Sequence, residues 1–215
     1  MKRTQAGFTL IELAIVLVII GLLLGGVLKG QELINSAKAK SIASDLKNAQ
    51  IFIYGYQDKF KALPGDDANV VAHMTGSTLA TTNGPVGNAR IGGAWDSAVL
   101  TDESALFWQH VRLAGFATGP TNTADANYLP RNSDNGRIGV QSLAGFVTIT
   151  GMTGLYVVCS DNIRGQLVKQ IDINMDDGDP STGSLRAVVA GTSNVAGVAT
   201  AAIVDGNAYT MCMTF

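Results

Sequence analysis

The chain has 215 residues, of which 47% are hydrophobic and 15% are charged, and its formal net charge at pH 7 is -2. This charge argues against a broad nucleic-acid-binding surface, which requires clustered Lys and Arg in a basic domain. With two His and two Cys, zinc sites that need several such ligands and multi-disulfide frameworks are nearly excluded. No HExxH, GxSxG, phosphate-binding-loop or dinucleotide-binding motif is present in the sequence, and we therefore expect no enzyme.

The N-terminal segment is the most hydrophobic part of the chain. Residues 8–28 contain one charged residue, Glu12, and as a helix they would be about 31 Å long, close to the ~30 Å hydrocarbon core of a bilayer. Lys2 and Arg3 precede this stretch, and such basic residues stay on the cytoplasmic side. The sequence therefore predicts a membrane-spanning helix with the rest of the chain on the far side, periplasmic or extracellular.

Residues 7–13, Gly-Phe-Thr-Leu-Ile-Glu-Leu, follow a short basic leader and open the apolar stretch. This combination closely resembles the class III signal sequences of type IV prepilins and type II secretion pseudopilins. The resemblance implies that residues 1–7 are a cleaved leader, that a prepilin peptidase cuts between Gly7 and Phe8, and that the new amino group of Phe8 is methylated. It also implies identical or related pilin subunits and an inner-membrane assembly platform as partners.

Glu12 is predicted to act in assembly. A carboxylate in hydrocarbon costs roughly 2 to 3 kcal/mol, and it is tolerated if the Phe8 ammonium of a neighbouring subunit neutralises it. We therefore favour a structural subunit of a type IV pilus-like filament, a minor or specialised pilin that moves from the inner membrane into a periplasmic or cell-surface filament. A type II secretion pseudopilin is an alternative, and so is a single-span anchor that carries a periplasmic binding or enzyme domain.

The N-terminal helix is expected to continue beyond the membrane. Apolar residues recur at helical spacings as far as Phe60, and Leu63-Pro64-Gly65 should end the helix. We therefore predict one helix over residues 8–61, whose span 8–28 is the transmembrane part or filament core, and a head over 62–215. The apolar stripe is expected to pack in the core of the head: Ala39, Ile42, Leu46, Ala49, Ile53, Tyr56 and Phe60.

The head is expected to contain short elements separated by turns. Residues 101–113 have a helical pattern that Asp102 can cap and Gly115 can end, and residues 163–175 fit a helix better than a strand. Strands are predicted at 146–150, 155–159, 185–190 and 209–213. This order predicts an α+β fold with an antiparallel sheet, as the pilin-like resemblance also implies.

Asp176, Asp177 and Asp179 crowd one turn of the head, and Asp172 precedes Asp176 by one helical turn. Carboxylate oxygens at this density could hold calcium. The spacing does not fit an EF-hand, because the required Gly comes one place late, at Gly178, and no Glu stands at the twelfth position. The alternative is a turn without metal, since Asp, Gly and Pro are turn formers.

The cysteines and histidines are expected to be structural. Cys159 and Cys212 lie in a domain predicted to be exported, where a disulfide between them would contribute roughly 4 kcal/mol. Two buried thiols in adjacent strands are the alternative. His73 and His110 lie in no metal-binding spacing, and we expect His110 to pack or cap within its helix.

Overall fold

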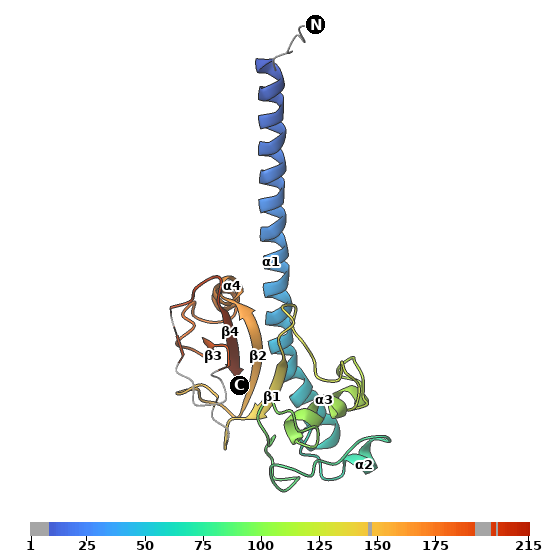
Figure 1. The fold of residues 1–215 in the computed structure, drawn as a ribbon. Coiled ribbons are helices and arrows are strands. Elements are labelled where there is room, and N and C mark those ends of the chain that lie inside the picture. The colour runs from blue at the N-terminus through green and yellow to red at the C-terminus, as the bar shows by residue number, and fades with distance from the viewer. Residues whose placement is uncertain (1–8, 146–147, 192–198, 201) are drawn as a thin grey trace. The chain divides into compact units, whose positions relative to one another are not determined.

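The chain folds into two compact units that share one long helix. The computed structural model describes residues 9–145, 148–191, 199–200 and 202–215. The two units are Met1–Ala37 and Lys38–Phe215. Helix α1 (Leu10–Phe60) begins in the first unit and ends in the second (Figure 1). After α1, Lys61 adopts a positive φ of 55°, the left-handed conformation that commonly follows a last helical turn.

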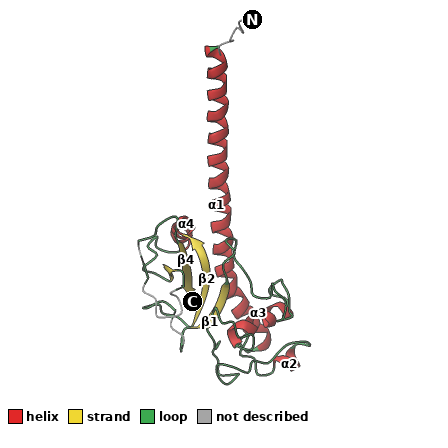
Figure 2. Ribbon diagram, in the orientation of Figure 1, coloured by secondary structure: helices red, strands yellow, loops and turns green. Residues whose placement is uncertain are grey.

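The second unit, called the head below, combines short helices with one sheet (Figure 2). Its further helices are α2 (Val70–His73), α3 (Glu103–Leu113) and α4 (Gly165–Met175). Its strands are β1 (Ile138–Ser142), β2 (Tyr156–Arg164), β3 (Leu185–Val189) and β4 (Ala208–Thr214). All pairings are antiparallel, in the order β1-β2-β4-β3. The predicted α+β class with a long N-terminal helix and an antiparallel sheet is therefore confirmed.

One predicted strand differs from the structure, and one observed strand was not predicted. The strand predicted at 146–150 lies partly outside the described residues, and its described part, 148–150, belongs to no strand. Strand β1 is absent from the prediction because Gly139 and Gln141 interrupt its apolar pattern. A Cβ on Gly139 would stand 1.9 Å from the carbonyl oxygen of Trp95. The glycine is therefore required where a loop covers this edge strand.

Alternate residues of the sheet face two separate clusters of buried side chains. Tyr156 and Val158 of β2 belong to the main core, which α1, α3 and α4 also fill. Val157 and Cys159 belong to a second cluster that includes Trp95. This division follows from the two-residue period of a strand, and it buries both faces of the sheet.

The predicted stripe of α1 lies in the core of the head. Its members from Ala39 to Tyr56 are at most 1% exposed, and Phe60 is partly buried against a smaller cluster of Tyr56, Val70 and Met74. The prediction that these side chains form core is confirmed. Their burial against strands and helices from the rest of the head anchors the last part of α1 by apolar packing.

The turn after α1 is fixed by Gly65 and by α3. Gly65 has a φ of 94°, and a Cβ there would lie 2.3 Å from the carbonyl oxygen of Glu103. Any other residue would clash with the start of α3. Asp102 occupies the N-cap position of α3, but its side chain makes no capping bond. Its two oxygens instead accept the hydroxyl groups of Thr82 and Ser97, which corrects the predicted side-chain cap.

Candidate functional site

The first turn of α1 is closed by a reciprocal bond between Thr9 and Glu12. The N–H and the hydroxyl of Thr9 each donate to Glu12 Oε2 at 2.8 Å, and the Glu12 N–H donates to Thr9 Oγ1 at 3.3 Å. This arrangement is a capping box, and it holds the carboxylate at the positive end of the helix dipole. Thr9 is absent from the sequence-based prediction, although Thr-x-x-Glu before an apolar run is the signature of this motif.

The helix that follows Glu12 exposes apolar side chains on all its sides. The large apolar residues between Leu10 and Leu28 are 46% to 87% exposed within the chain. Helix α1 is the one described helix that is long and apolar enough to cross a membrane. A helix that is apolar all round needs a lipid or protein environment. Gly7 and Phe8, the predicted cleavage site, lie outside the described residues.

Cys159 of β2 and Cys212 of β4 are joined by a disulfide. The two residues stand directly opposite in the strand register, with their Cα atoms 4.1 Å apart. Both are fully buried and pack in the same cluster as Trp95. The structure thus contains the disulfide and not the two free thiols that were the alternative. The bond links the two central strands of the sheet.

The predicted acidic turn follows α4, but its carboxylates group differently from the prediction. One oxygen each from Asp172, Asp176 and Asp177 lies within 4.8 Å of the others. Asp179 is not in this group, and its Oδ1 accepts both the N–H and the hydroxyl of Ser181, at 2.9 and 2.6 Å. The structure thus brings together Asp172, Asp176 and Asp177, whereas the calcium ligands predicted from the sequence were Asp176, Asp177 and Asp179.

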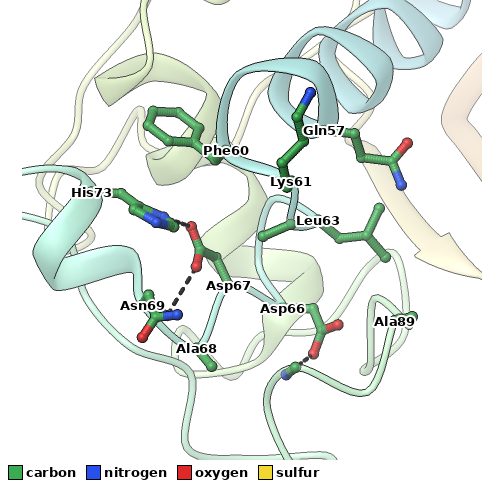
Figure 3. A pocket seen from close by; sticks show the side chains of 12 residues that line it. Gln57, Phe60, Lys61, Leu63, Asp66, Asp67, Ala68, Asn69, His73 and Ala89 are labelled. Carbon is green, nitrogen blue, oxygen red and sulfur yellow. Dashed lines mark hydrogen bonds and ion pairs between the residues drawn. The ribbon is translucent and has the colours of Figure 1, made fainter.

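A cavity of about 460 Å³ lies beside the end of α1 (Figure 3). The buried carboxylate of Asp67 accepts the Tyr56 hydroxyl at 2.8 Å, the Asn69 N–H at 2.9 Å and His73 Nδ1 at 2.6 Å. The His73 ring also stacks on Phe60, with the ring centroids 5.1 Å apart. Sequence reasoning does not find this cluster, because no local motif joins these positions. Since Asp67 ties α1 to α2 and the segment between them, the cluster braces the turn that follows α1.

Replacing Tyr56 by Phe should destabilise the head through this cluster. The change removes one hydrogen bond to a buried carboxylate, and such bonds contribute about 1.5–3 kcal/mol. We expect urea denaturation of the full-length chain to show a loss of about 2 kcal/mol. Tyr54→Phe changes a half-exposed ring on the same helix and should cost less than about 0.5 kcal/mol. Equal losses in the two variants would contradict the assigned role of Asp67.

Helix α3 uses buried polar side chains to hold the loops around it. Gln109 accepts the Thr78 N–H at 2.7 Å and donates to the Thr121 carbonyl at 2.9 Å. His110 Nδ1 accepts the Gly65 N–H at 2.9 Å, so Nε2 carries the hydrogen that it shares with the Thr78 carbonyl. Burial lowers the pKa of His110, which keeps the ring neutral. His110 is buried, as expected, but its ring bonds join segments outside α3 and do not cap the helix.

Comparison with known proteins identifies the N-terminal segment. A family model described as the prokaryotic N-terminal methylation motif matches residues 2–28. No curated protein and no solved structure matches the chain. The matched range contains the basic leader, the Thr9 and Glu12 capping box and the apolar start of α1. Residues 2–28 therefore form a class III signal sequence like that of type IV prepilins, which supports a precursor of the type IV pilin or pseudopilin type.

Proposed function

We propose that the protein is a structural subunit of a type IV pilus-like filament, most simply a minor or specialised pilin. The observation that carries this proposal is the methylation motif at residues 2–28, directly on a helix whose apolar side chains are exposed on all sides. The membrane would cover these side chains before assembly, and neighbouring helices would cover them in the filament. We also propose that the protein is not an enzyme.

The capping box suggests how Glu12 takes part in assembly. Both bonds from Thr9 end on Glu12 Oε2, and among the described residues no donor contacts Oε1. Cleavage after Gly7 would create an ammonium group on Phe8, which methylation keeps basic. In the proposed filament this group, on the next subunit, pairs with Glu12 and sets the vertical register of the two helices.

The destination of the subunit is a separate part of the proposal. After cleavage by the prepilin peptidase, the head would stand in the periplasm, and the assembly platform of the inner membrane would then add the subunit to a filament. The motif is shared by pilins and pseudopilins, so a type II secretion pseudopilin is the second candidate. A single-span anchor has no need for cleavage on the cytoplasmic side, and Glu12 would then be dispensable.

Replacing Glu12 by Ala tests the proposal. We expect the variant to be cleaved and to reach the membrane, but its amount in sheared filaments should fall at least about tenfold, because removing one partner of a buried ion pair costs about 3–5 kcal/mol. The measurement is quantitative mass spectrometry of sheared surface material and of the inner membrane, with the N-terminal peptide identified. Glu32→Ala is the matched control, since Glu32 is an exposed acid of α1 that pairs with Lys29.

Three results would separate the candidates. Sheared filaments that contain a chain beginning at methylated Phe8 support the pilin. Processed chain found in the membrane alone favours the pseudopilin. An intact leader in cells with an active prepilin peptidase, or normal incorporation of the Glu12→Ala variant, would contradict assembly through this segment.

A further inference from the structure

Asp172 is a buried carboxylate that no side chain reaches with a hydrogen bond, and the Gly178 N–H, the backbone donor that acts on it, meets no strict hydrogen-bond geometry. Asp172 lies in the last turn of α4 with no exposed surface, and neither of its oxygens has a partner of hydrogen-bond geometry. A buried charge without compensation costs several kcal/mol. A charged Asp172 therefore needs a partner that the surrounding side chains do not supply.

The carboxylates of Asp176 and Asp177 face the same point. One oxygen from each, and one from Asp172, all lie within 4.8 Å of one another. Two oxygens that share one calcium ion at the usual 2.3–2.6 Å are at most about 5 Å apart. The three side chains thus already stand at separations that one ion can bridge, and they reach it from a helix and from the turn that follows.

The electrostatic surroundings of this group are unfavourable without a cation. The three acids stand at the C-terminal end of α4, where the helix dipole is negative. Asp179 stands in the same turn and adds a further negative charge that acts on Asp172. Arg186 is the basic residue whose charge acts on Asp177, but it forms no ion pair with any of the three acids. Its guanidinium instead donates to the carbonyl groups of Gly183 and Thr150.

The other bonds of the two turn carboxylates leave room for an ion. Asp176 Oδ2 accepts the Leu185 N–H at 2.8 Å, which ties the end of α4 to the start of β3. Asp177 accepts the Asp179 N–H at 2.9 Å and the Thr182 hydroxyl at 2.6 Å. Each carboxylate oxygen has two acceptor positions, so these bonds orient the side chains and still allow coordination.

We propose that Asp172, Asp176 and Asp177 hold a divalent cation, and that calcium is the ion they fit. Calcium binds six to eight oxygens in irregular geometry, whereas magnesium demands a near-ideal octahedron. Asp177 is exposed, so water completes the coordination on the solvent side. The ion offsets the buried charge of Asp172 and locks the turn between α4 and β3. A head that works outside the cell meets calcium concentrations at which such a site fills.

Calcium titration of the full-length chain in detergent micelles tests this site. After treatment with EDTA and dialysis, isothermal titration calorimetry with CaCl2 should show one ion per chain, with a Kd of about 0.1–1 mM, the range of extracellular calcium modules. The melting temperature should rise with calcium concentration, because the ion binds the folded state. MgCl2 should bind at least about tenfold more weakly.

Asp172→Asn and Asp205→Asn form a matched pair of variants. Asp172→Asn should weaken calcium binding at least about tenfold and abolish the calcium-dependent rise in melting temperature. Without calcium it should melt no lower than the wild type, because it removes an uncompensated buried charge. Asp205 is an exposed acid that pairs with Lys169 of α4. The Asp205→Asn variant should therefore bind calcium like the wild type.

The outcomes that overturn the proposal are distinct. In the first, the wild type shows neither binding heat nor a rise in melting temperature up to about 10 mM calcium, a concentration above the range of known extracellular sites. In the second, Asp205→Asn loses calcium binding as strongly as Asp172→Asn, which would attribute the binding to diffuse surface charge. If Asp172→Asn does not fold, Asp177→Asn replaces it, since Asp177 is exposed. Wild-type calcium affinity in that variant would equally exclude the site.

Discussion

Removing the Cys159–Cys212 disulfide is expected to lower the free energy of unfolding of the head by about 4 kcal/mol. The bond closes a loop of 53 residues, and the loss of loop entropy in the unfolded chain gives this magnitude. Typical domains have a total stability of about 5–15 kcal/mol, so the disulfide contributes a large fraction of the free energy of unfolding. The reduced head should still fold, because backbone pairing between β2 and β4 does not depend on the bond.

Urea denaturation of the full-length chain in micelles measures this effect. The double variant Cys159→Ala and Cys212→Ala should unfold at a lower urea concentration than the wild type, and dithiothreitol should not change it. The wild type in dithiothreitol should approach the double variant. A loss below about 1 kcal/mol would show that the unfolded chain is already constrained, contrary to the loop-entropy account.

The second large effect is a dependence of stability on pH that Glu103 produces. Glu103 is fully buried at the start of α3, and its Oε2 accepts the Gly92 N–H at 2.6 Å. Burial is the largest cause that raises the pKa of Glu103, to about 7 from 4.5. The Gly92 N–H opposes this rise, whereas Asp66, through its charge and a side-chain hydrogen bond, and the charge of Asp102 add to it. The folded state therefore holds a proton that the unfolded state releases.

The direction of the pH effect follows from this difference. Below about pH 4.5 the carboxyl group is protonated in both states, so its contribution to stability is complete. As pH rises from about 4.5 to about 7, the unfolded chain loses the proton first, and the free energy of unfolding falls. Above about pH 7 the loss is complete and is on the order of 3 kcal/mol.

Glu103→Gln should remove this dependence. A glutamine can accept the Gly92 N–H with its amide oxygen, and it carries no charge to repel Asp66. We expect the variant to be more stable than the wild type at pH 8, by on the order of 3 kcal/mol, and to differ little from it at pH 4.5. The measurement is urea denaturation at both pH values with EGTA present, so that calcium does not contribute.

Asp172 also titrates in this pH range, but it is present in both the wild type and Glu103→Gln. The difference between these two proteins therefore isolates the effect of Glu103. Glu32→Gln serves as the control, since Glu32 is exposed in α1 and should alter the pH dependence little. If the free energies of unfolding of Glu103→Gln and the wild type differed by the same amount from pH 4.5 to pH 8, Glu103 would be ionised throughout this range, contrary to the prediction.

Several elements of the head could be predicted from neighbouring residues alone. The stripe of α1, helices α3 and α4 and strands β3 and β4 follow from hydrophobic period, which depends on residues a few positions apart. Strand β1 could not be found this way, because Gly139 is set by the close approach of Trp95 from a distant loop. Asp102 illustrates the same limit at a helix end, since Thr82 and Ser97 compete for the predicted cap.

The sequence by itself determined the class of the N-terminal signal segment, because the motif that identifies it is one continuous run, residues 2–28. The tertiary structure alone decided the chemistry of the head. It buried Asp172 beside Asp176 and Asp177, joined Tyr56 and His73 to Asp67, and isolated Glu103 from water. Burial and charge proximity are properties of the folded chain, and they arise from packing between segments that the sequence separates.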